Sequence, residues 1–396
     1  MTTFDKTLLL NNADWYRREL TDNILAFWTE KGLDRINGGM FTCLDREGNL
    51  MDSTKSVWFQ GRCAYVYSYA YNNVERNPEW LSVAKSCIDF IERHCIDPQT
   101  GQLYFTVTAE GKALRKRRYV FSDCFAAIAM AEYAKASGDK VYVEKSLDIF
   151  NHIRYMLNTP GFLEAKSLEA ARGHSITMIL INVALVLKQV SNDPVLDLQI
   201  QESIEALEKY FIHPEYKCIL ETVSLEGKMI DTCEGRTINP GHGIETAWFL
   251  MQAADVYGNE HYRELGLQIF DWQYEWGWDK EFGGIINFRD CRNFPPQDYS
   301  QDMKFWWPQC ETILASLYAY KATRDEKYLK IYKETHDWAM EHLRDNQGRE
   351  WFGYLHRDGS VAQDAKGNLF KGPFHIPRML VLASKLCNQI IDESYE

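Results

Sequence analysis

The segment Gly38-Gly-Met-Phe-Thr-Cys-Leu-Asp-Arg-Glu-Gly48 decides the fold, because related segments recur along the chain. In each of them a glycine or another turn precedes alternating aromatic and small residues, and a charged turn follows. This pattern predicts a short β-hairpin. Further copies stand at residues 101–111, 216–227, 283–290 and 348–359, with a degraded copy at 160–165. The copies lie about 60 residues apart, so six units of similar length fill the chain.

Two helical patterns lie between successive hairpins, and they differ in hydropathy. The first of each pair is apolar nearly all round, as in Ile176-Thr-Met-Ile-Leu-Ile-Asn-Val-Ala-Leu-Val-Leu187, and predicts a buried helix. The second has a polar face, as in Tyr328-Leu-Lys-Ile-Tyr-Lys-Glu-Thr-His-Asp-Trp338, and predicts an outer helix that faces water. We expect these pairs at 59–72 and 79–95, 123–136 and 140–157, 174–190 and 196–211, 244–257 and 260–275, and 308–323 and 326–343.

The sixth pair is divided between the two ends of the chain. An apolar helix predicted at 375–391 has no partner after it, and a striped helix predicted at 12–31 has none before it. Joining the two closes a ring. The sequence therefore predicts an all-α fold, an (α/α)6 barrel or toroid with short β-hairpins at one rim. An open solenoid of helical pairs is the alternative. Because no Pro- or Ser-rich linker divides residues 1–396, we expect one domain.

Composition limits the classes of partner. The 396 residues include 56 Asp and Glu against 44 Lys and Arg, and the net charge of -12 opposes nucleic acid and anionic membranes as partners. No apolar run reaches the roughly 20 residues of a membrane helix, and the N-terminus lacks the pattern of a secretory signal. The ten cysteines include no C-x-x-C pair. We therefore expect a cytoplasmic protein with reduced thiols.

Candidate functional residues gather where the inner helices begin. All six inner helices of such a ring run the same way, so their N-termini open on a common cavity. The residues at these ends are polar, titratable or aromatic, as in a site for a small polar ligand. In chain order they are Gln60 and Arg62, Ser122 and Asp123, Arg172 and His174, His242 and Glu245, Trp306, Trp307 and Glu311, and His375 and Arg378.

The two later histidines also have structural interpretations. His242 and Glu245, three residues apart, fit an N-terminal capping pair, and His375 fits a turn histidine packed on Phe374. A metal site is not expected, because His242-x-x-Glu245 matches no metal-binding motif and no cysteine stands at ligand spacing to it.

The other candidates have structural interpretations as well. Arg62 fits an ion pair with a glutamate such as Glu311, because a buried arginine is costly without a partner. Of Trp306 and Trp307, one is expected in the core and the other in the cavity wall. Asp123 fits a helix cap.

Six segments resemble the N-acylglucosamine 2-epimerase family, in the same order and over nearly the whole chain. They are Asn37-Gly-Gly-Met-Phe-Thr-Cys-Leu-Asp-Arg-Glu-Gly48, Val57-Trp-Phe-Gln-Gly-Arg62, Val120-Phe-Ser-Asp-Cys-Phe125, Ile238-Asn-Pro-Gly-His-Gly-Ile-Glu-Thr-Ala-Trp-Phe-Leu250, Lys304-Phe-Trp-Trp-Pro-Gln-Cys-Glu311 and Lys371-Gly-Pro-Phe-His-Ile-Pro-Arg378. Their common order and spacing make the resemblance specific. It implies an (α/α)6 barrel, in agreement with the ring deduced from the repeats.

The resemblance also implies roles for individual residues. His242 and His375 look like the family's catalytic histidine pair, and Arg62 looks like its sugar-binding arginine. His174 has no implied role beyond contact. Several family members are activated by ATP that they do not hydrolyse, although this chain has no phosphate-binding loop, and family behaviour implies a homodimer. The remaining substrate-binding residues expected at the cavity are Glu245, Glu311, Trp307 and Arg378.

The implied reaction interconverts N-acyl-D-glucosamine and N-acyl-D-mannosamine. The sugar ring must open, because the C2 proton can be removed only beside a carbonyl group. The proton then leaves one face of C2 and returns on the other, through an enediolate. Two imidazoles on opposite sides do this simply, since each titrates near neutrality. Arg62 is expected to stabilise charge on the C1 or acyl oxygen, and no metal or redox cofactor is required.

Other functions are compatible with the same barrel. A cellobiose-type 2-epimerase or an aldose-ketose isomerase uses related proton transfers, although the motif at 371–378 favours the N-acyl sugar branch. A glycoside hydrolase needs two carboxylates, for which Glu245 and Glu311 are candidates. A non-catalytic sugar-binding protein is the remaining alternative.

Overall fold

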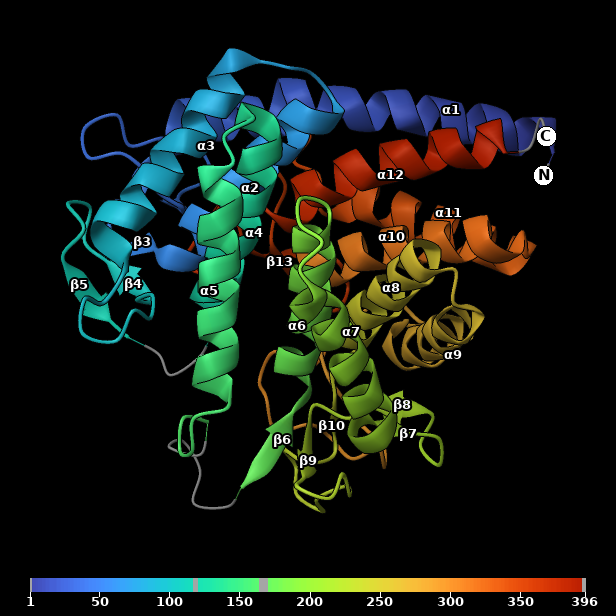
Figure 1. Ribbon diagram of the computed structural model, residues 1–396. Helices are drawn as coiled ribbons and strands as arrows, with labels where there is room; N and C mark the ends of the chain where they lie inside the picture. Colours follow the sequence, from blue (N-terminus) through green and yellow to red (C-terminus); the bar gives the residue numbers. More distant parts are fainter. Residues whose placement is uncertain (1, 117–119, 164–169, 394–396) are drawn as a thin grey trace.

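The computed structural model describes residues 2–116, 120–163 and 170–393, in which twelve α-helices alternate between an inner and an outer ring (Figure 1). The inner helices are α2 (Val57–Asn73), α4 (Phe121–Ser137), α6 (His174–Lys188), α8 (Pro240–Tyr257), α10 (Trp306–Thr323) and α12 (His375–Asp392). The outer helices are α1 (Thr3–Arg18), α3 (Pro78–Phe90), α5 (Val141–Leu157), α7 (Pro194–Ala206), α9 (Glu260–Gly277) and α11 (Glu326–His342). Short π-helical segments follow α1 (Glu19–Leu25 and Trp28–Gly32), α3 (Ile91–Cys95) and α7 (Leu207–Phe211).

The six inner helices form a closed ring. Each packs against the next in chain order, from α2 to α12, and α12 packs against α2. Each outer helix from α3 to α11 packs against the inner helix that precedes it, while α1 covers α12 (Figure 1). The predicted (α/α)6 barrel is confirmed, and the open solenoid is excluded. The helix predicted at 12–31 begins earlier, at Thr3, because the Thr2 side chain accepts the backbone N–H of Asp5 and caps the helix there.

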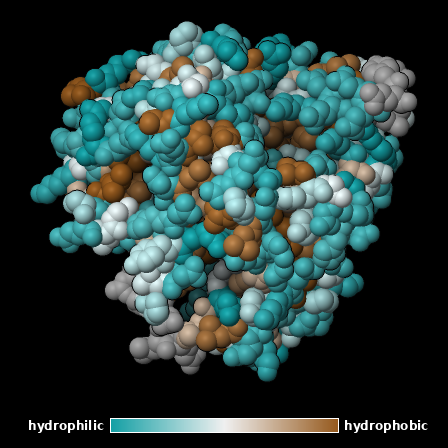
Figure 2. Space-filling model, viewed as in Figure 1, coloured by the Kyte–Doolittle hydropathy of each residue, from teal (hydrophilic) through white to brown (hydrophobic). Residues whose placement is uncertain are grey.

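Burial follows the hydropathy difference between the two kinds of helix. The inner helix α4 buries every residue from Ser122 to Ala134. The outer helix α11 buries residues at helical spacing, including Tyr328, Tyr332 and Thr335, and leaves its other face to water. The face seen in Figure 2 is accordingly mostly hydrophilic, with hydrophobic groups between the polar side chains.

Short strands lie at the rim where the inner helices begin. Four of them, β3 (Lys55–Ser56), β6 (Ala171–Gly173), β10 (Thr237–Ile238) and β12 (Lys304–Phe305), end directly or one residue before an inner helix. Three predicted copies of the repeat contribute antiparallel hairpins. These are β1 (Cys43–Leu44) with β2 (Leu50–Asp52), β4 (Thr106–Val107) with β5 (Ala113–Arg115), and β13 (Tyr354–Leu355) with β14 (Val361–Gln363).

The copy at 216–227 also forms a hairpin, because Val223 pairs with Met229 across a turn in which the N–H of Ser224 donates to the carbonyl oxygen of Lys228 at 2.9 Å. Its strands make further pairs, β8 (Cys218–Ile219) with β7 (Ile212–His213) and β9 (Thr222–Ser224) with β6. The hairpin predicted at 283–290 is wrong in its pairing, because β11 (Arg289–Asp290) pairs with β10. The degraded copy at 160–165 extends into residues outside the described ones.

Glutamine side chains join the rim to the inner helices at two equivalent places. Gln60 of α2 accepts the N–H of Met40 at 2.8 Å and donates to its carbonyl oxygen at 2.9 Å. Gln309 of α10 makes the same two bonds to Ile285, at 2.8 and 2.9 Å. Gly39 must be glycine, because it has a φ of +74° and a Cβ there would lie 2.5 Å from Gln60 Oε1. The repeated glycine turns therefore fix where each inner helix begins.

Three fully buried lysines tie successive rim segments together. Each ammonium group forms an ion pair with an aspartate that follows an outer helix and also donates to backbone carbonyl oxygens. The pairs are Lys55 with Asp34 at 2.6 Å, Lys304 with Asp279 at 3.1 Å, and Lys366 with Asp345 at 2.7 Å. Asp279 and Asp345 also pair with Arg357 and Arg46, whereas Asp34 has no second cation among the described residues, so removing Lys55 leaves a buried and unpaired carboxylate.

No helix within the described residues is long and apolar enough to cross a lipid bilayer. The ten cysteines form no disulfide, and nine of them are buried.

We predict that Lys55→Met destabilises the fold by about 3 kcal/mol, because it leaves the Asp34 carboxylate buried without its counterion. Urea unfolding measures this difference. Lys280→Met is the matched control, since the Lys280–Glu275 pair is exposed and its loss should change stability by less than about 0.5 kcal/mol. Equal stability of the Lys55 variant and the control would contradict the proposed importance of the buried pair.

Candidate active site

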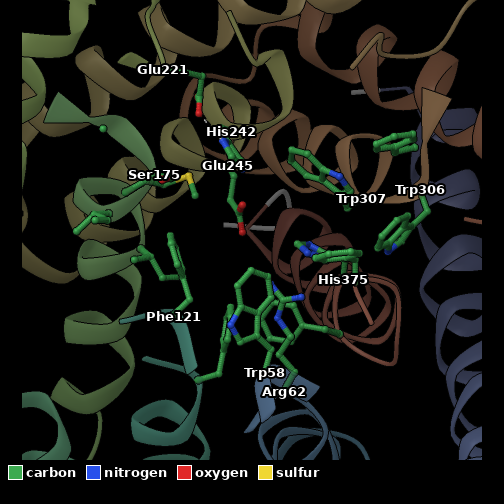
Figure 3. A pocket seen from close by; sticks show the side chains of 18 of the residues that line it. Trp58, Arg62, Phe121, Ser175, Glu221, His242, Glu245, Trp306, Trp307 and His375 are labelled. Atoms are coloured by element: carbon green, nitrogen blue, oxygen red, sulfur yellow. Dashed lines mark hydrogen bonds and ion pairs between the residues drawn. The ribbon is translucent and has the colours of Figure 1, made fainter. Parts of the chain in front are cut away.

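A cavity of about 700 Å³ lies at the N-terminal ends of the inner helices (Figure 3). Residues from all six inner helices or the positions just before them line it. Six of the residues proposed from the sequence are among them, namely Arg62 of α2, His242 and Glu245 of α8, Trp306 and Trp307 of α10 and His375 of α12. The volume and the mixture of aromatic and polar groups suit a small polar ligand.

His242 lies in the first turn of α8 with its imidazole in the cavity wall. Asn239 caps the helix, since its Oδ1 accepts the backbone N–H of His242 at 3.2 Å, so the predicted capping pair with Glu245 does not form. Nδ1 of His242 lies 2.9 Å from Oε2 of Glu221. A carboxylate only accepts hydrogen bonds, so Nδ1 carries a proton and Nε2 is the nitrogen left for a ligand.

The charge of Glu221 favours the protonated form of His242. Burial lowers the pKa of His242, but the negative charge and hydrogen bond of Glu221 outweigh this effect and raise the pKa above its ordinary value of 6.5. The pKa of Glu221 in turn is held well below its usual value by His242 and His174, against the effect of burial. His242 is therefore the group from which a proton is available near neutral pH.

His375, the first residue of α12, has the opposite resting state. Its Nδ1 donates to Oε1 of Glu311 at 2.7 Å, and Trp248 Nε1 holds the other oxygen of Glu311 at 2.8 Å. Burial lowers the pKa of His375 well below its ordinary value, and the charge of Arg378 lowers it further, with Nη2 only 3.4 Å from Nδ1. His375 is thus neutral at pH 7, with a lone pair on Nε2.

Trp307 places the two imidazoles in one compartment. Its ring centroid lies 5.2 Å from that of His242 and 5.8 Å from that of His375. The side chains lie around the same open space in Figure 3, with Trp307 beside both histidines. His375 also packs on Phe374, with 5.0 Å between centroids, as the turn interpretation expected, but this contact does not remove it from the cavity.

Glu245, Glu311 and Arg378 form a buried cluster behind the cavity wall. Nη2 of Arg378 donates to Oε1 of Glu245 at 2.6 Å and to Oε1 of Glu311 at 2.7 Å. Glu245 reaches the cavity, whereas Glu311 and Arg378 are fully buried behind it. Glu311 and Arg378, which were expected to bind substrate, therefore do not line the cavity. Arg378 compensates the charge of Glu311, and Glu311 orients His375.

Arg62 presents a positive charge that no described carboxylate neutralises at ion-pair distance. The predicted partner Glu311 is engaged by Arg378 instead. The guanidinium of Arg62 lies over Phe125 and Phe374, at 4.0 and 4.7 Å from the ring centroids, and its buried Nε has no hydrogen-bond partner. Burial lowers the pKa of Arg62 to about 9, so the group remains charged at pH 7. An oxygen-bearing ligand would satisfy it.

Trp306 contributes to both the core and the cavity. It is buried, and its ring centroid lies 6.2 Å from that of His375. The expected division of the tryptophan pair into one core and one wall residue is too simple, because both side chains line the cavity.

Asp123 serves the fold and does not line the cavity. Its Oδ1 accepts the backbone N–H of Leu103 at 3.1 Å, which is the same rim contact that Gln60 makes to Met40. The helix cap is Val120, so the predicted capping role is also wrong. Burial raises the pKa of Asp123 to about 7.

Sequence reasoning missed Glu221, which joins His242 to His174. The one available signal was a single carboxylate in the apolar run Cys218-Ile-Leu-Glu-Thr-Val223. His174 is fully buried, and its Nδ1 lies 3.1 Å from Oε1 of Glu221. Its predicted contact with the site is therefore indirect.

Among the described residues, two groups of side chains have donor atoms close enough to hold a metal ion. In the first, His174, Glu221 and His242 bring their donor atoms within 4.8 Å of one another. In the second, Glu245, Glu311 and His375 do so. The guanidinium of Arg378 already lies between the two carboxylates of the second group, where its positive charge opposes a cation.

The fold and the cavity define an (α/α)6-barrel protein with two carboxylate-bonded histidines at one cavity. Comparison with known proteins narrows this class, because the family described as N-acylglucosamine 2-epimerase matches residues 39–372. The N-acylglucosamine 2-epimerase of Bos taurus is 32% identical over 388 residues, covering 96% of this chain and 92% of that protein. The chain belongs to the N-acylglucosamine 2-epimerase family.

More distant relatives share the same architecture. The cellobiose 2-epimerase of Ruminococcus albus is 27% identical over 388 residues, covering 92% of this chain and 96% of that protein. The solved structure of cellobiose 2-epimerase from Spirochaeta thermophila DSM 6192 superposes with a TM-score of 0.85 at 20% identity, covering 100% of both chains. The second likeness concerns the fold alone.

We predict that the two imidazoles titrate in separate pH ranges. His242 should titrate above 6.5 and His375 well below it, because Glu221 stabilises the first imidazolium while burial and Arg378 destabilise the second. Ring nitrogen shifts followed by long-range proton–nitrogen NMR across pH 4 to 9 measure both, with His242→Asn and His375→Asn for assignment. Two coincident titrations near pH 6.5 would contradict the assigned resting states.

Proposed function

We propose that this protein interconverts N-acyl-D-glucosamine and N-acyl-D-mannosamine. One observation carries the proposal: two imidazoles, each oriented by a carboxylate through Nδ1, line one cavity, and their pKa values are shifted in opposite directions. Inversion at a carbon requires one group that removes a proton and another that returns one. A neutral and a protonated imidazole supply these two groups at the same pH.

The chemistry follows from the sugar in its open-chain form. The carbonyl at C1 makes the C2 proton removable, and His375 as the neutral base takes it from one face. An enediolate forms, in which C2 is planar. His242 as the acid then delivers a proton to the other face, which inverts the configuration. In the reverse direction the roles exchange, since each imidazole is an acid when protonated and a base when neutral.

Arg62 supports the enediolate through its uncompensated charge. The guanidinium lies in the cavity wall among Trp58, Phe125 and Phe374, where the low dielectric strengthens its attraction for a negative oxygen. We assign it to the C1 oxygen or the acyl oxygen. Trp307, in contact with both histidines, offers a flat face for the sugar carbon chain.

The alternative activities receive less support. Identity is higher to the N-acylglucosamine 2-epimerase of Bos taurus, at 32%, than to the cellobiose 2-epimerase of Ruminococcus albus, at 27%. Hydrolysis would need one protonated carboxyl and one carboxylate beside the substrate. Glu245 and Glu311 instead share the guanidinium of Arg378, and Glu311 is buried behind the wall.

We extend the proposal to cofactors, partners and cellular location. The mechanism needs no metal or redox cofactor, because both proton transfers use imidazoles. The family resemblance adds ATP as an activator that is not hydrolysed, and a homodimer. A net charge of -12 fits a small amino sugar as partner in the cytoplasm, with neither nucleic acid nor membrane.

Proton NMR in deuterated buffer tests the function. With N-acetylglucosamine or N-acetylmannosamine as substrate, we expect the other epimer to appear with deuterium at C2, because the returned proton comes from a group that exchanges with solvent. A ketose labelled at C1 would indicate an isomerase. Binding without label at C2 would contradict the proposal.

Variants of a single histidine distinguish a mechanism with two acid–base groups from a mechanism with one. His375→Asn and His242→Asn should each lose epimerisation by at least about 100-fold. Each variant should still exchange the C2 proton of the epimer whose proton faces the remaining histidine, and the two variants should differ in which epimer this is. Epimerisation within tenfold of the wild type in either variant would remove that histidine from the mechanism.

A further inference from the structure

Glu221 is held by its backbone between three elements of the rim. Its N–H donates to the carbonyl oxygen of Thr237 at 3.1 Å, and its own carbonyl oxygen accepts the N–H of His174 at 3.0 Å. Glu221 thus lies between β8 and β9 with a fixed main chain, and its side chain points toward the cavity (Figure 3). A side chain on a backbone anchored in this way has a narrow range of positions.

The two carboxylate oxygens of Glu221 bind two different histidines. Oε2 lies 2.9 Å from Nδ1 of His242, and Oε1 lies 3.1 Å from Nδ1 of His174. His174 is fully buried, and its Nε2 lies 3.0 Å from Oγ1 of Thr246. Thr246 in turn donates to the carbonyl oxygen of His242 at 2.9 Å. The bonds therefore form a closed loop that begins and ends at His242.

This loop involves three separate parts of the barrel. His174 belongs to α6, Glu221 to the connection between β8 and β9, and His242 and Thr246 to α8. A hydrogen-bonded loop across three elements restricts the imidazole of His242 more than a single bond would, because rotation of the ring breaks the bond to an anchored carboxylate.

We propose that Glu221 is a positioning residue for epimerisation, which holds His242 with Nε2 toward the substrate, and that His174 and Thr246 hold Glu221 in turn. This inference rests on the proposed function, in which His242 is one of the two acid–base groups. Glu221 touches the imidazole on the side away from the reacting carbon, so it acts through His242. The bond between Glu221 and His242 also favours the protonated imidazole, and this form of His242 donates the proton.

The carboxylate that orients His242 keeps its full negative charge, whereas the carboxylate that orients His375 shares its charge with an arginine. Oε1 of Glu311, which orients His375, is shared with the guanidinium of Arg378. Glu221 has no arginine or lysine at ion-pair distance among the described residues, so its full charge acts on imidazoles. The titratable and charged groups that face His242 from the surrounding elements are Arg62 of α2, His174 of α6, Glu221, Glu245 of α8, Glu311 of α10, and His375 and Arg378 of α12.

Glu221→Gln tests the proposal with little change in volume. The amide nitrogen cannot accept a hydrogen bond from either Nδ1, and the negative charge is lost. We expect kcat to fall about 10- to 100-fold while KM changes less than about threefold. The proton of His242 is then lost at lower pH, so the basic limb of the kcat/KM profile should move to lower pH. Unchanged kcat together with an unchanged basic limb would overturn the proposal.

The pair of Glu215 and His213 provides a matched control. Glu215 accepts a hydrogen bond from Nδ1 of His213 at 3.0 Å, and Glu215 is exposed. Glu215→Gln removes a carboxylate–histidine pair of the same kind and should leave kcat and the pH profile at wild-type values. A loss in this control equal to that of Glu221→Gln would show a general effect on folding and overturn the proposal.

Glu221→Asp separates charge from position. It keeps the negative charge but shortens the side chain, so we expect the basic limb to stay near its wild-type position while kcat falls about tenfold. Thermal unfolding checks that each variant is folded. If Glu221→Gln does not fold, Glu221→Asp carries the test, and wild-type kcat in that variant would overturn the proposal.

The NMR titration of His242 makes this test independent of the substrate. In Glu221→Gln the pKa of His242 should fall, whether or not N-acyl hexosamines are the true substrates. Failure of the wild type to epimerise them would overturn the proposed function, whereas an unchanged His242 titration in the variant would overturn the role of Glu221.

Discussion

The buried contact of Arg378 with Glu245 and Glu311 is the interaction on which the rest of the site depends. It joins α12, α8 and α10, the three inner helices that supply both histidines and Trp307. The positive charge of Arg378 stabilises the two carboxylates, which would be costly to bury without a cation. The same cluster fixes His375 through Glu311 and, by its positive charge, disfavours the imidazolium form of His375. This cluster therefore joins the three helices and also favours the neutral form of His375.

The two imidazoles are chemically different although their positions in the barrel correspond. His242 bonds to Glu221, whose negative charge is not shared with an arginine, whereas the carboxylate beside His375 is also bonded to Arg378. In the proposed mechanism one ring therefore acts first as the acid and the other as the base. One turnover would exchange the two states, and exchange with solvent would restore the first. Reversible epimerisation thus follows from a pair of groups of the same kind in unequal surroundings.

The fold could be predicted because its cause is repeated in the sequence. Turns such as Gly38-Gly39 recur along the chain, with Lys217 and Glu350 taking the positive φ in two of the copies, and a ring of parallel inner helices brings the first turns of those helices together. The presence of His242 and His375 at one cavity follows from that geometry. The role of Glu221 could not be predicted, because its strand pairs with segments distant in sequence, nor could the burial of Glu311 and Arg378, which depends on packing between neighbouring helices. Local patterns indicate where helices begin but not which carboxylate meets which histidine.

The central claim is that two imidazoles face one carbon from opposite sides. A crystal structure of the protein with N-acetylglucosaminitol, an open-chain analogue without the C1 carbonyl, tests it most directly. The account predicts that C2 lies between the Nε2 atoms of His242 and His375, about 3.5 Å from each and on opposite faces, with Arg62 at the C1 or acyl oxygen. A ligand whose C2 is approached by both nitrogens from one side, or by only one of them, would contradict it.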